Sequence, residues 1–183
     1  MSFSFGEKIK ITIFGKSHSE AMGVVIENLP AGFKIDEDKL SEFMKRRAPG
    51  QDEFSTPRKE EDKVHFISGL ADGKTCGSSL CGVIYNTNTR SKDYDNLKNI
   101  PRPSHADFAA WASLGEARDV RGGGQFSGRL TACICIAGGI LKQIYEAQGI
   151  YIGAHISSIG KIEDDLFDAV NVTQKDFPDE KDF

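Results

Sequence analysis

The alternation of apolar and polar positions predicts two strands near the start of the chain. Residues 8–14 carry isoleucine at every second position, which is typical of a strand with one buried face. A continuous apolar run over 23–29 predicts a second strand, which Pro30 ends. We expect the two strands to pair, with the glycine- and serine-containing loop 15–19 near their junction.

Helix signals mark three further segments. Asp36 is a candidate N-cap for a helix that ends in a basic cluster at Arg47. The pair Ser104 and Asp107 resembles a capping box, which would start a second helix and place the histidine between them in its first turn. A long apolar helix is predicted over 130–148, with a glycine directly after it as its stop.

The remaining apolar runs complete the predicted fold class. Further strands are expected over 64–68, 80–86 and 150–159, the first two joined by a hairpin-like connection. This mixture predicts an α/β (α+β) protein of mainly antiparallel strands packed on buried helices. We expect one domain over 1–160, followed by an acidic tail over 161–183.

Charge is concentrated in that tail. Residues 161–183 carry eight acidic side chains and three lysines, so they contribute −5 to a net charge of −4 and leave the body at +1. A nearly neutral body is not a general nucleic-acid surface. No apolar run reaches the roughly 18 residues of a membrane span, and the first residues carry no secretory signal. We therefore expect a soluble, cytoplasmic protein with no nucleic-acid or membrane partner.

The four cysteines predict no metal site. Four residues separate Cys76 from Cys81, and one residue separates Cys133 from Cys135, so neither pair has the CxxC spacing of a zinc site. We expect four reduced, mostly buried thiols.

A glycine run precedes the long apolar helix. Gly122, Gly123 and Gly124 would let the backbone approach a ligand closely, and a helix N-terminus after them would favour a phosphate. Arg121 and Arg129 flank the run and could make bidentate contacts to phosphate or carboxylate. Neither a Walker P-loop nor a dinucleotide fingerprint fits the spacing. A plain connection between elements is the alternative interpretation.

Two of the four histidines are candidates for proton transfer. His18 and His105 lie in tight polar loops at element boundaries, where a side chain that titrates near pH 6.5 suits proton donation. His65 and His155 fall inside strand patterns without polar companions, and we interpret both as structural.

Six short motifs give these candidates a family context. Their order and spacing closely resemble the N-terminal half of chorismate synthase, and residues 126–132 look like the variant of clostridial-type members. The motifs are FGKSH at 14–18, RRAPGQ at 46–51, STPR at 55–58, RSKDY at 90–94, RPSHAD at 102–107 and RGGG at 121–124.

The resemblance implies a reaction. The family converts 5-enolpyruvylshikimate 3-phosphate to chorismate by 1,4-elimination of phosphate, in the shikimate pathway to aromatic amino acids. It is a flavoprotein family that requires reduced FMN, and whether this chain would reduce its own flavin with NADPH stays open. The implied fold is a sandwich of helices between two antiparallel sheets, assembled as a homotetramer. We therefore expect a homo-oligomer, because half of such a sandwich would expose apolar surface from the helix 130–148.

The resemblance also assigns site residues by motif. His18 matches the histidine proposed to protonate the departing phosphate, and His105 matches the one proposed to protonate the reduced flavin. The arginines expected near the substrate's anionic groups are Arg47, Arg102 and Arg129. The stretch expected to contact the flavin is Gln125, Phe126 and Ser127.

Several positions depart from the family pattern. Lys16 replaces a usual glutamate and reverses a local charge, while Ser19 and Ser104 stand where glycine is usual. Glu53 and Gln125 stand where cations are more usual. Family members are also about twice as long. Two hypotheses follow: a lyase that uses reduced FMN, or a catalytically inactive binding or assembly module derived from it.

Overall fold

The computed structural model describes residues 3–48, 62–87, 100–154 and 156–164. They fall into two compact units, Met1–Leu141 and Lys142–Phe183, and each is described by itself. Glu53, the motifs at 55–58 and 90–94, His155 and the tail beyond residue 164 lie outside the described residues.

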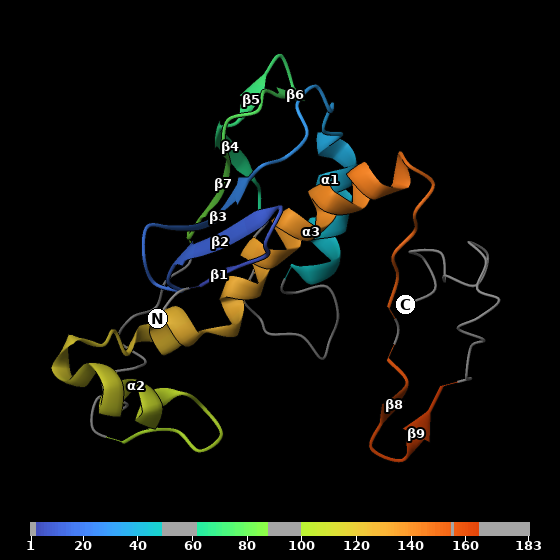
Figure 1. The fold of residues 1–183 in the computed structure, drawn as a ribbon. Coiled ribbons are helices and arrows are strands. Elements are labelled where there is room, and N and C mark those ends of the chain that lie inside the picture. Colours follow the sequence, from blue (N-terminus) through green and yellow to red (C-terminus); the bar gives the residue numbers. More distant parts are fainter. Residues whose placement is uncertain (1–2, 49–61, 88–99, 155, 165–183) are drawn as a thin grey trace. The chain divides into compact units, whose positions relative to one another are not determined.

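The first unit is built on a five-stranded antiparallel sheet (Figure 1). The predicted pairing of the first two long strands is confirmed, with a continuous register from Lys10↔Glu27 to Gly15↔Met22. The order along the sheet is β1 (Ser4–Phe5), β2 (Lys10–Gly15), β3 (Ala21–Glu27), β7 (Leu80–Tyr85) and β4 (His65–Ser68).

One face of this sheet forms the core. Strand pairing places alternate residues of β2, β3 and β7 on the same face, because side chains alternate along a strand. Ile13 of β2 is paired with Val24 of β3, which is paired with Gly82 of β7. A Cβ atom on Gly82 would lie 3.3 Å from the side chain of Ile136, so a helix covers this face directly. The buried residues of this face are Ile11, Met22, Val24, Ile26, Leu80 and Ile84.

Two helices, α1 (Glu37–Arg47) and α3 (Thr131–Glu146), pack together on the covered face (Figure 1). The predicted N-cap is confirmed, since the Asp36 carboxylate accepts the Lys39 N–H at 3.0 Å. A Cβ atom on Gly139 of α3 would lie 2.7 Å from Leu40 of α1, so the missing side chain permits close approach of the helices. The mixed α/β class with antiparallel sheets is therefore confirmed.

The predicted strand over 150–159 is wrong. The Ile150 N–H bonds to the Tyr145 carbonyl, so the chain there closes the end of α3, and Gly149 adopts a φ of +75°. Residues 150–154 form no strand, and only β8 (Ser158–Ile159) and β9 (Ile162–Glu163) pair as a short hairpin. A similar short hairpin, β5 (Leu70–Ala71) with β6 (Lys74–Thr75), lies in the connection between β4 and β7.

The cysteine and membrane expectations have mixed outcomes. All four cysteines are free, but only Cys133 is buried, and Cys76 is exposed. Burial raises the pKa of the Cys133 thiol to about 12. Among the described residues, no three histidine, cysteine or acidic side chains gather as metal ligands. None of the described helices has the length and hydropathy to cross a bilayer.

Candidate active site

The glycine run forms a tight turn, in which Gly123 and Gly124 are buried. Gly122, Gly123 and Gly124 have φ angles of +59°, +86° and +56°, values that side-chain-bearing residues rarely adopt. They lie in η3 (Arg121–Phe126), and the short turn η4 (Gly128–Leu130) separates them from α3. The glycine run thus precedes the long helix, as predicted, but several residues separate it from the helix N-terminus. The glycine run instead contacts the two loops that carry His18 and His105.

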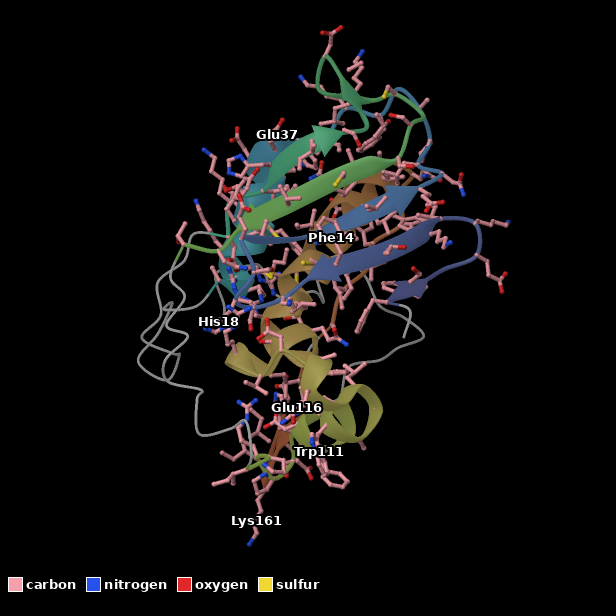
Figure 2. The ribbon with its side chains drawn as sticks, turned by 90° about the vertical axis from the view of Figure 1, so that its left-hand side faces the viewer. Phe14, His18, Glu37, Trp111, Glu116 and Lys161 are labelled. Atoms are coloured by element: carbon pink, nitrogen blue, oxygen red, sulfur yellow. The ribbon has the colours of Figure 1, made fainter. Side chains whose placement is uncertain are left out.

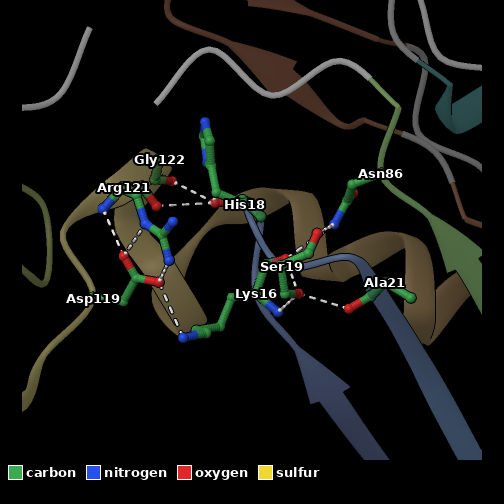
Figure 3. A network of polar contacts seen from close by, with 9 residues as sticks. Lys16, His18, Ser19, Ala21, Asn86, Asp119, Arg121 and Gly122 are labelled. Atoms are coloured by element: carbon green, nitrogen blue, oxygen red, sulfur yellow. Dashed lines mark hydrogen bonds and ion pairs between the residues drawn. The ribbon is translucent and has the colours of Figure 1, made fainter. Parts of the chain in front are cut away.

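The first histidine loop contacts Gly122 (Figure 3). A Cβ atom on this glycine would lie 2.3 Å from Cε1 and Nδ1 of His18 and 2.5 Å from the Ser17 hydroxyl. The buried Ser17 hydroxyl lies 3.3 and 3.2 Å from the Arg121 and Gly122 carbonyls and 3.2 Å from His18 Nδ1. Since the hydroxyl donates to a carbonyl, it can accept a hydrogen from Nδ1.

The second histidine loop contacts the next glycine. A Cβ atom on Gly123 would lie 2.9 Å from Cε1 and Nε2 of His105. His105 Nδ1 lies 2.7 Å from an Asp107 carboxylate oxygen, and Arg102 Nη2 lies 3.3 Å from both ring nitrogens. Because the carboxylate can only accept, Nδ1 carries the hydrogen, and Nε2 is the nitrogen that can accept from the Arg102 guanidinium or take up a proton. Neighbouring glycines thus hold the rings of His18 and His105.

The predicted capping box at the second loop is wrong. Asp107 does not cap the helix that it begins, α2 (Asp107–Leu114), whose N-cap is Ala106 without a side-chain bond. Its carboxylate instead accepts the Arg102 backbone N–H at 3.0 Å and the Arg102 guanidinium at 2.8 and 3.0 Å. These hydrogen bonds hold the pKa of Asp107 well below its usual range. His105 consequently precedes the helix and does not lie in its first turn.

Lys16 does not leave a reversed charge in the site. Its ammonium lies 3.0 Å from the Asp119 carboxylate, which Arg121 also binds through two nitrogens at 2.7 and 2.8 Å (Figure 3). Hydrogen bonds from Arg121, and then from Lys16, hold the pKa of Asp119 well below its usual range. The guanidinium of Arg121 is therefore directed to Asp119, and Lys16 fastens the first histidine loop to the segment before the glycines.

Ser19, a departure from the expected motif, makes hydrogen bonds within its own loop. Its hydroxyl accepts the Lys16 N–H at 3.0 Å and lies 2.8 and 2.6 Å from the carbonyls of Lys16 and Ala21. The Asn86 amide donates to the carbonyls of Lys16 and Ser19 at 3.1 and 2.9 Å (Figure 3). The substitution thus adds hydrogen bonds that fix the loop carrying the first histidine.

Two of the predicted substrate arginines meet at a residue that the sequence did not reveal. Asp62, whose side chain is fully buried, accepts hydrogen bonds from Arg129 and, at 3.2 Å, from Arg47. Arg47 also donates to the Thr131 hydroxyl and to the Gly128 carbonyl, both at 3.3 Å. Asp62 has no motif around it, because its partners come from distant segments. The third predicted arginine, Arg102, lies apart from this pair, beside His105.

The predicted flavin-contacting stretch is divided. Gln125 and Phe126 line a small open pocket of about 70 Å³, together with Lys16 and the apolar side chains Ala110 and Leu114. The Ser127 hydroxyl instead accepts the Arg129 N–H at 3.2 Å at the start of η4. Residues of α2 line one side of this pocket. The Trp111 side chain of the same helix projects outward and is half exposed (Figure 2).

The remaining described histidine has a packing role. The ring of His65 in β4 lies edge-on to Tyr85 of the neighbouring strand β7, with ring centroids 5.3 Å apart. His65 is exposed and lies on the sheet, whereas His18 follows β2 and His105 precedes α2.

Comparisons with known proteins show the family to which the chain is similar. The model of the family "Chorismate synthase" matches residues 9–182. A chorismate synthase of Lancefieldella parvula is 48% identical over 93% of this chain and 45% of its own length. One from Methanocaldococcus jannaschii is 43% identical over 89% of this chain and 43% of its own length. The chain thus spans somewhat less than half of the curated relatives that it matches.

A solved structure of a chorismate synthase shares the fold. It superimposes with a TM-score of 0.62 over 86% of this chain and 39% of that chain, at 23% sequence identity. The structural likeness therefore concerns the architecture, and it covers the same partial share of a longer protein.

Proposed function

Because the chain belongs to the chorismate synthase family, we propose that it supplies the N-terminal part of a chorismate synthase active site. The reaction would be the 1,4-elimination of phosphate from 5-enolpyruvylshikimate 3-phosphate to give chorismate. The observation that carries this proposal is the glycine turn, which holds the rings of His18 and His105 at neighbouring residues. Two proton-exchanging groups held against one glycine turn suit a reaction that expels phosphate and removes a ring hydrogen.

The residues around the pocket fit part of a reduced flavin. The apolar side chains of Ala110, Leu114 and Phe126 suit a flat ring system, and the Gln125 amide can bond to polar atoms at its edge. In the proposed reaction, bound reduced FMN would supply electron density while the phosphate leaves. Gln125 and Phe126 are the residues of this chain that would contact it.

His18 is proposed as the acid for the leaving phosphate. Ser17 can accept the hydrogen on Nδ1, which fixes the ring, and Nε2 is the nitrogen that we propose as the proton donor. The Ser17 hydroxyl is itself held by backbone carbonyls, so the ring has a rigid support.

His105 is proposed to hold a proton on the flavin side of the site. Its Nδ1 is fixed by Asp107, in the manner of a histidine oriented by a carboxylate, and Nε2 can exchange a proton. Arg102 lies against the same ring and adds a positive charge that suits an anionic group of the substrate.

The arginine pair is proposed to bind the substrate's other anionic groups. The substrate carries a phosphate and two carboxylates, which require several cationic partners with fixed geometry. Arg47 and Arg129 converge on one buried carboxylate and are held in place before any ligand is bound.

An anaerobic assay tests the proposal. The chain is mixed with reduced FMN and 5-enolpyruvylshikimate 3-phosphate, and chorismate is followed by its absorbance. His18→Ala and His105→Ala should each lower turnover by roughly 10²-fold or more, whereas His65→Ala, the matched control on the sheet, should not. The absence of both product and flavin binding would refute the enzyme proposal for this chain by itself.

The second candidate function is binding or assembly without turnover. The observation that favours it is the coverage, since the matched relatives are more than twice as long as the aligned segment. Repeating the assay with a polypeptide that contains the remaining part of a relative separates the two. Product only in the mixture would show that this chain supplies a partial site that needs its complement.

We also propose self-association. Ile134 and Tyr145 of α3 are 43% and 37% exposed, and self-association through this helix would cover them. A monomer at all concentrations in light scattering would contradict this.

A further inference from the structure

A single carboxylate joins two arginines from different parts of the chain. Asp62 lies just before β4, Arg47 lies in the last turn of α1, and Arg129 lies in η4. The Asp62 side chain is fully buried, and the Arg129 and Arg47 side chains are only 6% and 23% exposed. An ion cluster this far from water is costly to bury unless its hydrogen bonds are well made.

Three hydrogen bonds fix the orientation of the Arg47 guanidinium. Arg47 donates from Nη1 to Asp62, from Nε to Thr131 and from Nη2 to the Gly128 carbonyl. Three donors of the planar guanidinium therefore have fixed partners, and the plane of the group is set. An arginine that only offset the dipole of α1 from its last turn would not need these three partners.

Among the described residues, the cluster holds two cationic side chains and one anionic side chain. Two guanidinium groups face one carboxylate, and burial raises the pKa of the adjacent Cys133 thiol to about 12, so that the thiol adds no negative charge. A buried or half-buried positive charge of this kind attracts an anionic group.

Asp62 is also held in an unfavourable backbone conformation. Its φ is +49°, in the left-handed region that aspartate tolerates but does not prefer. Such a conformation persists where surrounding contacts determine it, and it often accompanies a functional arrangement. The backbone strain and the double ion pair point to the same residue.

We propose that Asp62 is a positioning residue, which holds Arg47 and Arg129 as a pre-formed pair for the phosphate or a carboxylate of the ligand. This inference deepens the proposed function and rests on it for the identity of the ligand. Asp62 does not touch the ligand in this account. It fixes the separation and orientation of the two cations that do.

Calorimetric titration with 5-enolpyruvylshikimate 3-phosphate tests the role. Asp62→Asn keeps the shape but loses the charge, so the arginines repel one another and the dissociation constant should rise at least about tenfold. Asp38→Asn, an exposed acid in the first turn of α1, is the matched control and should bind as the wild type does. A folded Asp62→Asn variant with an unchanged dissociation constant would overturn the inference.

A measurement on the wild-type chain covers the case in which Asp62→Asn fails to fold. Nitrogen-15 NMR of the arginine side chains reports whether the guanidinium groups rotate freely. We expect separate, slowly rotating Nη signals for Arg129 and Arg47 before any ligand is added, and their persistence when inorganic phosphate is titrated. Averaged signals for both arginines would contradict a pre-formed pair.

The two measurements separate the inference from the proposed function. If the wild-type chain does not bind the substrate but its arginine signals are held, the proposed function fails for this chain and the pre-formed pair stands. If the substrate binds equally well to wild type and Asp62→Asn, the proposed function stands and the role of Asp62 is refuted.

Discussion

The two histidine loops reach the same glycine turn but are held in different ways. His105 is fixed by charge, because its ring lies against Asp107 and Arg102. His18 is fixed by close packing on Gly122 and by the neutral Ser17 hydroxyl. The stability of the His105 loop should therefore depend on pH and on the Asp107 carboxylate. The position of His18 should instead depend on the size of the residue at position 122.

The largest expected effect is on the His18 side. Gly122→Ala would place a Cβ atom 2.3 Å from the His18 ring at a φ of +59°, so the backbone is strained and the ring must move. We expect a loss of roughly 2–3 kcal/mol in the free energy of unfolding and a roughly 10²-fold loss of any turnover. Urea denaturation and the anaerobic assay measure the two effects.

Gly73→Ala is the control for that substitution. Gly73 has a φ of +71° with nothing within 4 Å of its would-be Cβ atom, so it reports strain without a clash. It should cost roughly 1–2 kcal/mol and leave the histidines undisturbed. Equal losses of turnover in both variants would show that His18 does not depend on contact with Gly122.

A smaller effect is expected on the His105 side, and it should depend on pH. The pKa of Asp107 is lowered from an ordinary value of 3.8, so its ion pairs stabilise the folded chain above that value. Asp107→Asn should cost about 1 kcal/mol at pH 7, because solvent screens part of the pairing. The gap from wild type should close as the pH falls below 3.8 towards the lowered pKa.

Urea titrations of wild type and Asp107→Asn at pH 7 and at pH 3 check this dependence. Glu116→Gln, at an exposed acid beyond the end of α2, should give no such gap at either pH. A difference between Asp107→Asn and wild type that is independent of pH would mean that charge does not hold the second loop.

The smallest expected effect concerns the turn before His105. Ser104 has a φ of +61°, which glycine adopts without steric cost. Ser104→Gly should therefore raise the free energy of unfolding by about 0.5 kcal/mol, since relief of strain is partly offset by a more flexible unfolded chain. A fall in stability in the same urea titration would show that the serine side chain supports the loop.

Local signals in the sequence predicted what local contacts determine. Asp36 caps α1 as expected, because its partner is the backbone three residues ahead. The capping box at Ser104 and Asp107 failed because Arg102 competes for the same carboxylate, and the pattern of spacing does not show such competition. The strand expected after Gly149 failed because the helix end uses the Ile150 N–H.

Contacts between residues far apart in the chain could not be predicted from the sequence. Both histidines were predicted as candidates from the loops in which they lie. Their shared position at the glycine turn depends on long-range contacts, such as the hydrogen bond from Ser17 to the carbonyl of Arg121, 104 residues away in the sequence. Asp62 had no signal, because its role depends on two arginines brought together by the packing of α1 against the start of α3.

Nuclear Overhauser effects between the glycine turn and the histidine rings test the central claim most directly. In a sample with labelled glycine and histidine, Gly122 Hα should show a cross-peak to the His18 Hε1 proton, and Gly123 Hα one to His105 Hε1. The two cross-peaks together would show that neighbouring glycines hold both rings in one site. Absence of either from a folded sample with both residues assigned would contradict the account.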